Sequence, residues 1–159
     1  RGQEAMSTPA IIVCTVNGAC LDVMTASLNA YVPQDVERYV HHKVGKNFGD
    51  AYNFAAREAF KRHDEILVCN DDIVFTPTTW AVLLADVAHL RKVVPDLGYV
   101  ATRSDYARGE QNVRSGRGKI DFLRYQSERH IVETPVIAPI CAWIHRDSWV
   151  DFPPIKSAR

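Results

Sequence analysis

Two aspartates and an asparagine stand where they could do chemistry together. Asn70, Asp71 and Asp72 directly follow the apolar run 66–69. Such a run is typical of a strand buried on both faces, and ligands of open α/β sheets bind beyond the carboxyl ends of their strands. Carboxylates held there can bind a hard divalent cation, which neutralises phosphate oxygens. The alternative is a solvated acidic turn whose side chains make only turn hydrogen bonds.

A second polar turn precedes this strand and opens a predicted helix over 47–63. Gly49 permits a close backbone approach, and the free N–H groups of a helix start favour an anion. Asn47 offers both a donor and an acceptor to sugar or ribose hydroxyls. An ordinary turn that leads into a helix is the alternative interpretation of these two residues.

The elements that must position these residues alternate along the chain. We expect strands at 11–16, 36–42, 66–69, 99–101 and 131–144, the last interrupted by two prolines. We expect helices at 21–32, at 47–63, and from Thr76 as N-cap and Pro77 as first helical residue through Leu90. Asp147 could cap a short turn, and 103–129, which lacks hydrophobic periodicity, is expected to be a mobile loop. This alternation predicts an α/β fold with a mostly parallel sheet.

The order of these motifs resembles that of family 2 glycosyltransferases. Residues 68–77 read Val-Cys-Asn-Asp-Asp-Ile-Val-Phe-Thr-Pro. This segment is similar to the family's D-x-D or N-x-D motif, which ends a strand before a helix opened by Thr-Pro. Residues 45–53 look like the family's N-x-G-x-A-x-x-N turn, with one residue fewer before the last Asn. The resemblance implies a Rossmann-like GT-A fold, with helices on both faces of a mostly parallel central sheet.

The resemblance also implies roles for individual residues. Asp72 would chelate Mn²⁺ or Mg²⁺, with His145 as a further candidate for metal or phosphate; an exposed turn histidine is the alternative for the latter. The nucleotide sugar would contact the remaining candidates, which are Thr15, Asn17, Asn47, Gly49, Asn53, Asn70 and Asp71.

Two departures from the family pattern concern acidic residues. The carboxylate that binds the nucleotide base in the family is missing here or replaced by Asp35 or Glu37. Inverting members carry a catalytic Asp or Glu beyond the last strand, and here only Asp151 stands near that place. We therefore expect either that Asp151 is the base or, preferably, that the base lies beyond Arg159.

The function that the resemblance implies is transfer of a sugar from a nucleoside-diphosphate sugar to an acceptor hydroxyl of a glycan, lipid or protein. A catalytically incomplete module that binds the nucleotide sugar is the alternative. A nucleotidyltransferase is a weaker alternative. Such enzymes open with a Gly-rich basic loop, whereas residues 17–20 hold one glycine and no basic residue.

Composition narrows the class of protein further. The chain has 159 residues and a formal net charge of zero, so bulk electrostatics give no argument for a nucleic-acid partner. We expect one domain over 6–159, incomplete at its C-terminus, after an expression-tag remnant at 1–5. The four cysteines include no CxxC pair, which favours reduced core thiols over a disulfide framework or a zinc site. No stretch is long enough for a membrane span, so a cytoplasmic location is expected.

Overall fold

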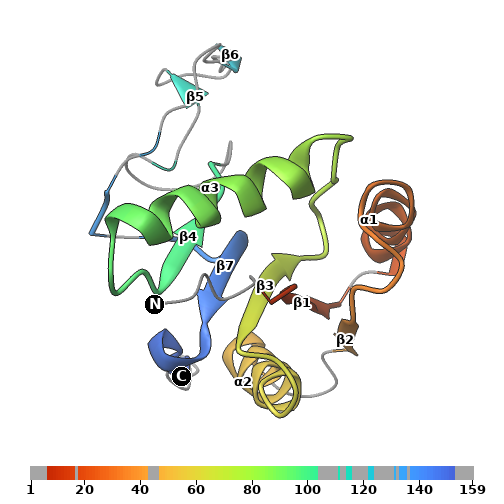
Figure 1. Cartoon of the computed structure of the whole chain (residues 1–159). Helices are drawn as coiled ribbons and strands as arrows, with labels where there is room; N and C mark the ends of the chain where they lie inside the picture. The colour runs from red at the N-terminus through yellow and green to blue at the C-terminus, as the bar shows by residue number, and fades with distance from the viewer. Residues whose placement is uncertain are drawn as a thin grey trace.

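The described part of the chain forms an α/β fold with three α-helices and a five-stranded mixed sheet (Figure 1). The computed structural model describes residues 7–16, 18–42, 47–103, 111, 114–115, 122–123, 131, 133–135 and 137–152. Most of the predicted loop 103–129 lies outside these residues, as do Asn17 and residues 1–5, which were predicted to be a tag remnant.

Three parallel strands form one half of the sheet. β1 (Ala10–Thr15) pairs in parallel with β2 (Arg38–His42) on one side and with β3 (Glu65–Asn70) on the other. All six residues of β1 are buried, which explains why its sequence is apolar without alternation. The parallel strands predicted at 11–16 and 66–69 are thus confirmed, while β2 begins two residues later than expected.

An antiparallel strand interrupts the parallel order on the other side of β3. The order is β2-β1-β3-β7-β4, and β7 (Cys141–His145) runs antiparallel to both β3 and β4 (Tyr99–Ala101). The strand expected over 131–144 is confirmed only from Cys141 onward, because the described residues among 131–140, which include both prolines, are not in a strand. A separate two-stranded sheet joins β5 (Arg114–Ser115) and β6 (Phe122–Leu123).

Helices cover both faces of the main sheet, as predicted. α1 (Gly18–Tyr31) and α3 (Thr79–Val93) pack on one face, in a core that includes Trp143, which is fully buried. α2 (Phe48–Ala59) covers the other face with a stripe of alanines, and these small side chains let the helix lie close to the strands.

The starts of α2 and α3 follow different capping rules. Asn47 is the N-cap of α2, and its Oδ1 accepts a hydrogen bond from the Asp50 N–H at 2.9 Å. The start predicted for α3 at Thr76 and Pro77 is wrong, because the N-cap is Thr78. Thr76 instead donates its N–H to Thr79 Oγ1 in the turn before the helix.

Candidate functional site at the carboxyl edge of the sheet

The ends of β1 and β3 bring Thr15 and Asp71 together. Thr15 Oγ1 donates to Asp71 Oδ2 at 2.5 Å, and the backbone N–H of Val16 lies 3.3 Å from the same oxygen. Thr15 is 1% exposed, so its hydroxyl orients Asp71 from below and does not itself form the surface. The second carboxylate oxygen of Asp71 is then the one that can bind a ligand. Thr15 and Asp71 were both predicted as site residues, and the hydrogen bond between them was not predicted.

Tyr52 of α2 holds the first residue of the polar turn. Its hydroxyl lies 3.0 Å from the carbonyl oxygen of Cys69 and 3.1 Å from Asn70 Oδ1. Because Asn70 Oδ1 accepts there, its Nδ2 amide is left as the group that suits a hydroxyl or phosphate oxygen better than a cation. Burial raises the pKa of the Tyr52 hydroxyl far above its usual range, so it stays a donor. Sequence reasoning missed Tyr52, whose partners stand 17 and 18 positions away.

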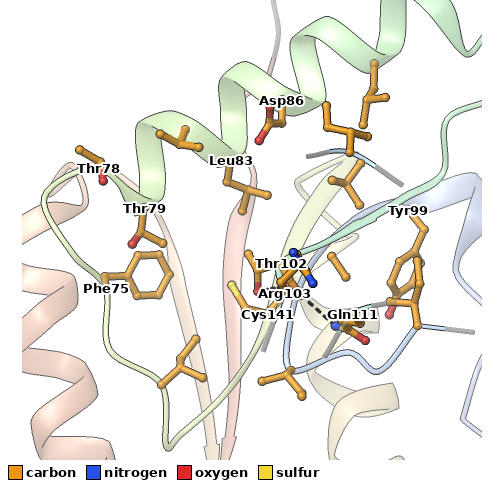
Figure 2. Close-up of a pocket in the computed structure, with 18 of the residues that line it drawn as sticks. Phe75, Thr78, Thr79, Leu83, Asp86, Tyr99, Thr102, Arg103, Gln111 and Cys141 are labelled. Carbon is orange, nitrogen blue, oxygen red and sulfur yellow. Dashed lines mark hydrogen bonds between the residues drawn. The ribbon is translucent and has the colours of Figure 1, made fainter. Parts of the chain in front are cut away.

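Asp72 is exposed and lies at the rim of a cavity of about 720 Å³. The wall that follows Asp72 is Ile73, Val74 and Phe75, and the opposite side comes from α3 and β4 (Figure 2). Phe75 is 1% exposed and donates its N–H to Ser27 Oγ of α1 at 3.0 Å, which anchors the end of the turn. A cavity of this size falls within the range of small-molecule sites, roughly 300–1,000 Å³.

Gln111 ties together two segments of the cavity wall, one directly after β4 and one before β7. Its Nε2 donates to the carbonyl oxygens of Thr102 and Ala138, both at 2.9 Å, and its Oε1 accepts from the Ala138 N–H at 2.8 Å. Gln111 is 5% exposed, and Figure 2 shows it close to Thr102 among the residues that line the cavity. The sequence predicted a mobile loop over 103–129 but gave no signal for this residue.

The predicted site residues on α2 fall into two groups, one near the polar turn and one that holds the C-terminal segment. Asn47 and Gly49 lie at the N-terminus of the helix, one turn before Tyr52, and so at the same edge of the sheet as Asn70. Asn53 is 7% exposed, and its amide makes two hydrogen bonds with the backbone of Phe152, at 3.0 and 2.8 Å. Asn53 therefore fixes the C-terminal segment to α2 in this structure.

His145 lies at the far edge of the sheet from Asp72. In the antiparallel register of β3 and β7, His145 pairs with Glu65, the first residue of β3, whereas the polar turn begins at Asn70, the last. Asn70 lies five positions after Glu65 along β3. At about 3.3 Å per residue, His145 is therefore about 16 Å from the polar turn. His145 instead caps a short 3-10 helix (Arg146–Ser148), a role that was expected of Asp147. The proposed site does not include His145.

Asp151 forms an ion pair with Arg57 and accepts a hydrogen bond from Trp149 Nε1 at 3.1 Å. The Trp149 N–H first, and then Arg57, hold the pKa of the Asp151 carboxyl below its usual range. A general base at neutral pH works best with a pKa near 7, so this environment opposes that role.

Glu37 is equally far from the proposed site. It precedes β2, whose first residue pairs with Ile11, at the opposite end of the sheet from Thr15. Its carboxylate binds Tyr39, His63 and Arg62. A nucleotide base at the carboxyl edge would not reach it. The alternative base-binding residue, Asp35, is exposed in the turn that precedes Glu37.

Oxygen donors suited to Mn²⁺ or Mg²⁺ remain at the polar turn. Asp72 and the second oxygen of Asp71 are hard ligands of the kind these cations bind. Within the described ranges, no group of three or more His, Cys, Asp or Glu side chains could hold a metal ion. A cation here would therefore need further oxygens from its ligand or from water.

The comparisons with known proteins add no family to this description. No model of a known protein family matches the chain, and no curated protein matches it either. In the part of the chain that the structure describes, no helix is long and apolar enough to cross a membrane. What stands is the fold class, an α/β domain with a mixed sheet and polar residues gathered at its carboxyl edge.

Proposed function

We propose that the chain binds a nucleoside-diphosphate sugar together with Mn²⁺ or Mg²⁺ at the carboxyl edge of the sheet, and transfers the sugar to an acceptor hydroxyl. The observation that carries the proposal is the position of Asp72, which lies between the polar strand ends and the rim of the cavity. A carboxylate in that place can meet a cation on one side and a reacting group in the cavity on the other.

Each part of the edge has a task in this proposal. Asp72 and Asp71 would hold the cation, which would neutralise charge on the diphosphate as it leaves. Asn70, held by Tyr52, would donate its amide to a ribose or phosphate oxygen. The first N–H groups of α2, behind Asn47, favour a phosphate through their partial positive charge. The cavity would take the sugar and the acceptor.

The test is calorimetric titration of nucleoside diphosphates into the chain, with and without Mn²⁺. We expect binding that requires the metal, and a loss of at least about tenfold in affinity in Asp72→Ala, or about 1.4 kcal/mol. Asp96→Ala is the matched control, because Asp96 is an exposed aspartate in the turn after α3. Equal affinity of the wild type and Asp72→Ala in the presence of Mn²⁺ would refute the metal site.

A second function is favoured by the surroundings of Asp151. Its ion pair with Arg57 and its lowered pKa argue against a base at this position. A module that binds the nucleotide sugar without transferring it fits that observation. Turnover separates the two: release of nucleoside diphosphate from a donor, in the presence of a panel of hydroxyl acceptors, supports the enzyme, and tight binding without release supports the module.

A further inference from the structure

Two cysteines face each other across neighbouring strands beneath the polar turn. Cys69 of β3 pairs in register with Cys141 of β7, and the two Sγ atoms lie 4.0 Å apart. Both side chains are buried in the core beneath α1 and α3. All four cysteines of the chain are free in the structure. The sulfur atoms of Cys69 and Cys141 are nevertheless close enough for the pair to be oxidised to a disulfide.

The backbone around this pair suits a cross-strand disulfide. The Asn70 N–H donates to the Ile140 carbonyl oxygen at 2.9 Å, so the ladder hydrogen bond lies beside the Cys69–Cys141 pair and not within it. A non-hydrogen-bonded antiparallel pair has Cα atoms about 4.5 Å apart and side chains on one face. Disulfides accept Cα separations of about 4.4–6.8 Å. Formation of the S–S bond therefore requires rotation of the two side chains more than movement of the strands.

The two thiols are joined by a hydrogen bond and differ in their access to the cavity. Cys141 lines the cavity next to α3, which gives a small molecule a route to its sulfur. The Cys69 S–H donates to the Cys141 sulfur, and this hydrogen bond holds the pKa of the Cys141 thiol below its usual range. A thiolate is the form that reacts with oxidants. Cys141 is thus suited to react first, and Cys69 to resolve the product.

We propose that Cys69 and Cys141 form an oxidative modification site, at which a small hydroperoxide enters through the cavity and converts the pair to a disulfide. The Cys141 thiolate attacks one peroxide oxygen, so that an S–O bond forms, the O–O bond breaks, and hydroxide leaves. Cys69 sulfur then attacks the sulfenic sulfur, forming the S–S bond and expelling the second oxygen as water. With hydrogen peroxide, two thiols lose two electrons and one peroxide becomes two waters.

The other two cysteines are internal references for this reaction. Cys14 faces the opposite side of the sheet, in the core beneath α2, and burial raises its pKa to about 12. Cys20 lies in α1 and is half-buried. Neither has the cross-strand partner that the proposal requires, so a specific reaction should leave both as thiols.

The experiment treats the full native chain with hydrogen peroxide, blocks remaining thiols by alkylation, and maps tryptic peptides without reduction. Cys69 falls in peptide 63–91 and Cys141 in peptide 130–146, while Cys14 and Cys20 share a third peptide. We expect a linked product of the first two peptides, a fall from four free thiols to two, and full recovery with dithiothreitol. Native chain that yields no linked product, or links only after unfolding in urea, would overturn the proposal.

Single substitutions separate the roles of the two sulfurs. In Cys69→Ser the reaction should stop at a sulfenic acid on Cys141, which dimedone traps, and in Cys141→Ser Cys69 should stay reduced. Cys14→Ser is the matched control and should link as the wild type does. Dimedone labelling confined to Cys20 in the Cys69→Ser chain would contradict the order of reaction. The wild-type map does not depend on how well any variant folds.

Discussion

The hydroxyl of Thr15 donates to Asp71 Oδ2 at 2.5 Å, and this contact joins the carboxyl ends of β1 and β3 across 56 positions of sequence. Two parallel strands lie side by side, so residues that end them meet at one edge. Thr15 is buried and Asp71 is half-buried, so the contact sets where one carboxylate oxygen of the polar turn lies.

The first prediction tests this contact. In Thr15→Val the side chain keeps its shape but loses its donor, and among the described residues Asp71 Oδ2 keeps the Val16 N–H at 3.3 Å. We expect the free energy of unfolding to fall by about 1.5 kcal/mol, because a hydrogen bond to a charged group is lost. Urea denaturation measures it. Thr25→Val, at an exposed position of α1, should change stability by less than about 0.5 kcal/mol. Equal stability of the two variants would mean that Asp71 turns to solvent without cost.

The second prediction concerns a buried carboxylate at the other edge of the sheet. Glu65 is 3% exposed and is held by Arg91 Nη2 at 2.5 Å and by Trp143 Nε1 at 2.9 Å. Removing the cation in Arg91→Met leaves a buried charge without its partner, which should cost about 3 kcal/mol of unfolding free energy. Lys92→Met, the exposed neighbour on the same helix, is the control. The double variant Arg91→Met with Glu65→Gln should recover part of the loss; no recovery would assign the loss to packing.

The sequence predicts the features that depend on neighbouring residues better than those that depend on contacts between distant segments of the chain. The buried run 11–15 and the turn at Asn70–Asp72 follow local patterns, and the structure places both as expected. The start of α3 was misplaced because Thr76 serves a turn that precedes the helix. The sequence could not show that His145 and Asp151 lie away from the polar turn, because sequence order does not reveal that β7 runs antiparallel to β3. That reversal carries the chain after β7 away from the polar turn, and then back along α2.

The third prediction follows from the lowered pKa of Asp151. A carboxyl whose pKa is lower in the folded than in the unfolded chain stabilises the fold above its unfolded pKa, and this contribution is lost as pH falls through the folded value. Stability measured from about pH 6 to about pH 2.5 should therefore differ between the wild type and Asp151→Asn at the upper end only. In an Arg57→Gln background, the effect of Asp151→Asn on stability at the upper end of this pH range should be smaller, because Arg57 is one cause of the lowered Asp151 pKa. A difference that persists undiminished at the acidic end would contradict the ionic origin.

The last prediction tests whether Tyr52 positions Asn70 for a ligand. Tyr52 is 5% exposed, and its hydroxyl reaches both the Cys69 carbonyl and Asn70 Oδ1. In Tyr52→Phe the core packing is kept, while the side chain of Asn70 loses the donor that fixes its amide. We expect a loss of about 1 kcal/mol in stability. If the proposed function holds, nucleoside-diphosphate affinity with Mn²⁺ should fall by about threefold to tenfold, while the requirement for metal stays.

The metal requirement is what separates positioning from a general loss of the fold. Tyr31→Phe, at an exposed position near the end of α1, is the matched control and should change neither quantity. Asn70→Ala in the Tyr52→Phe background gives the coupling between the two residues. If Asn70→Ala weakens binding equally with and without the Tyr52 hydroxyl, the two side chains act independently, and Tyr52 serves only the stability of the strand end.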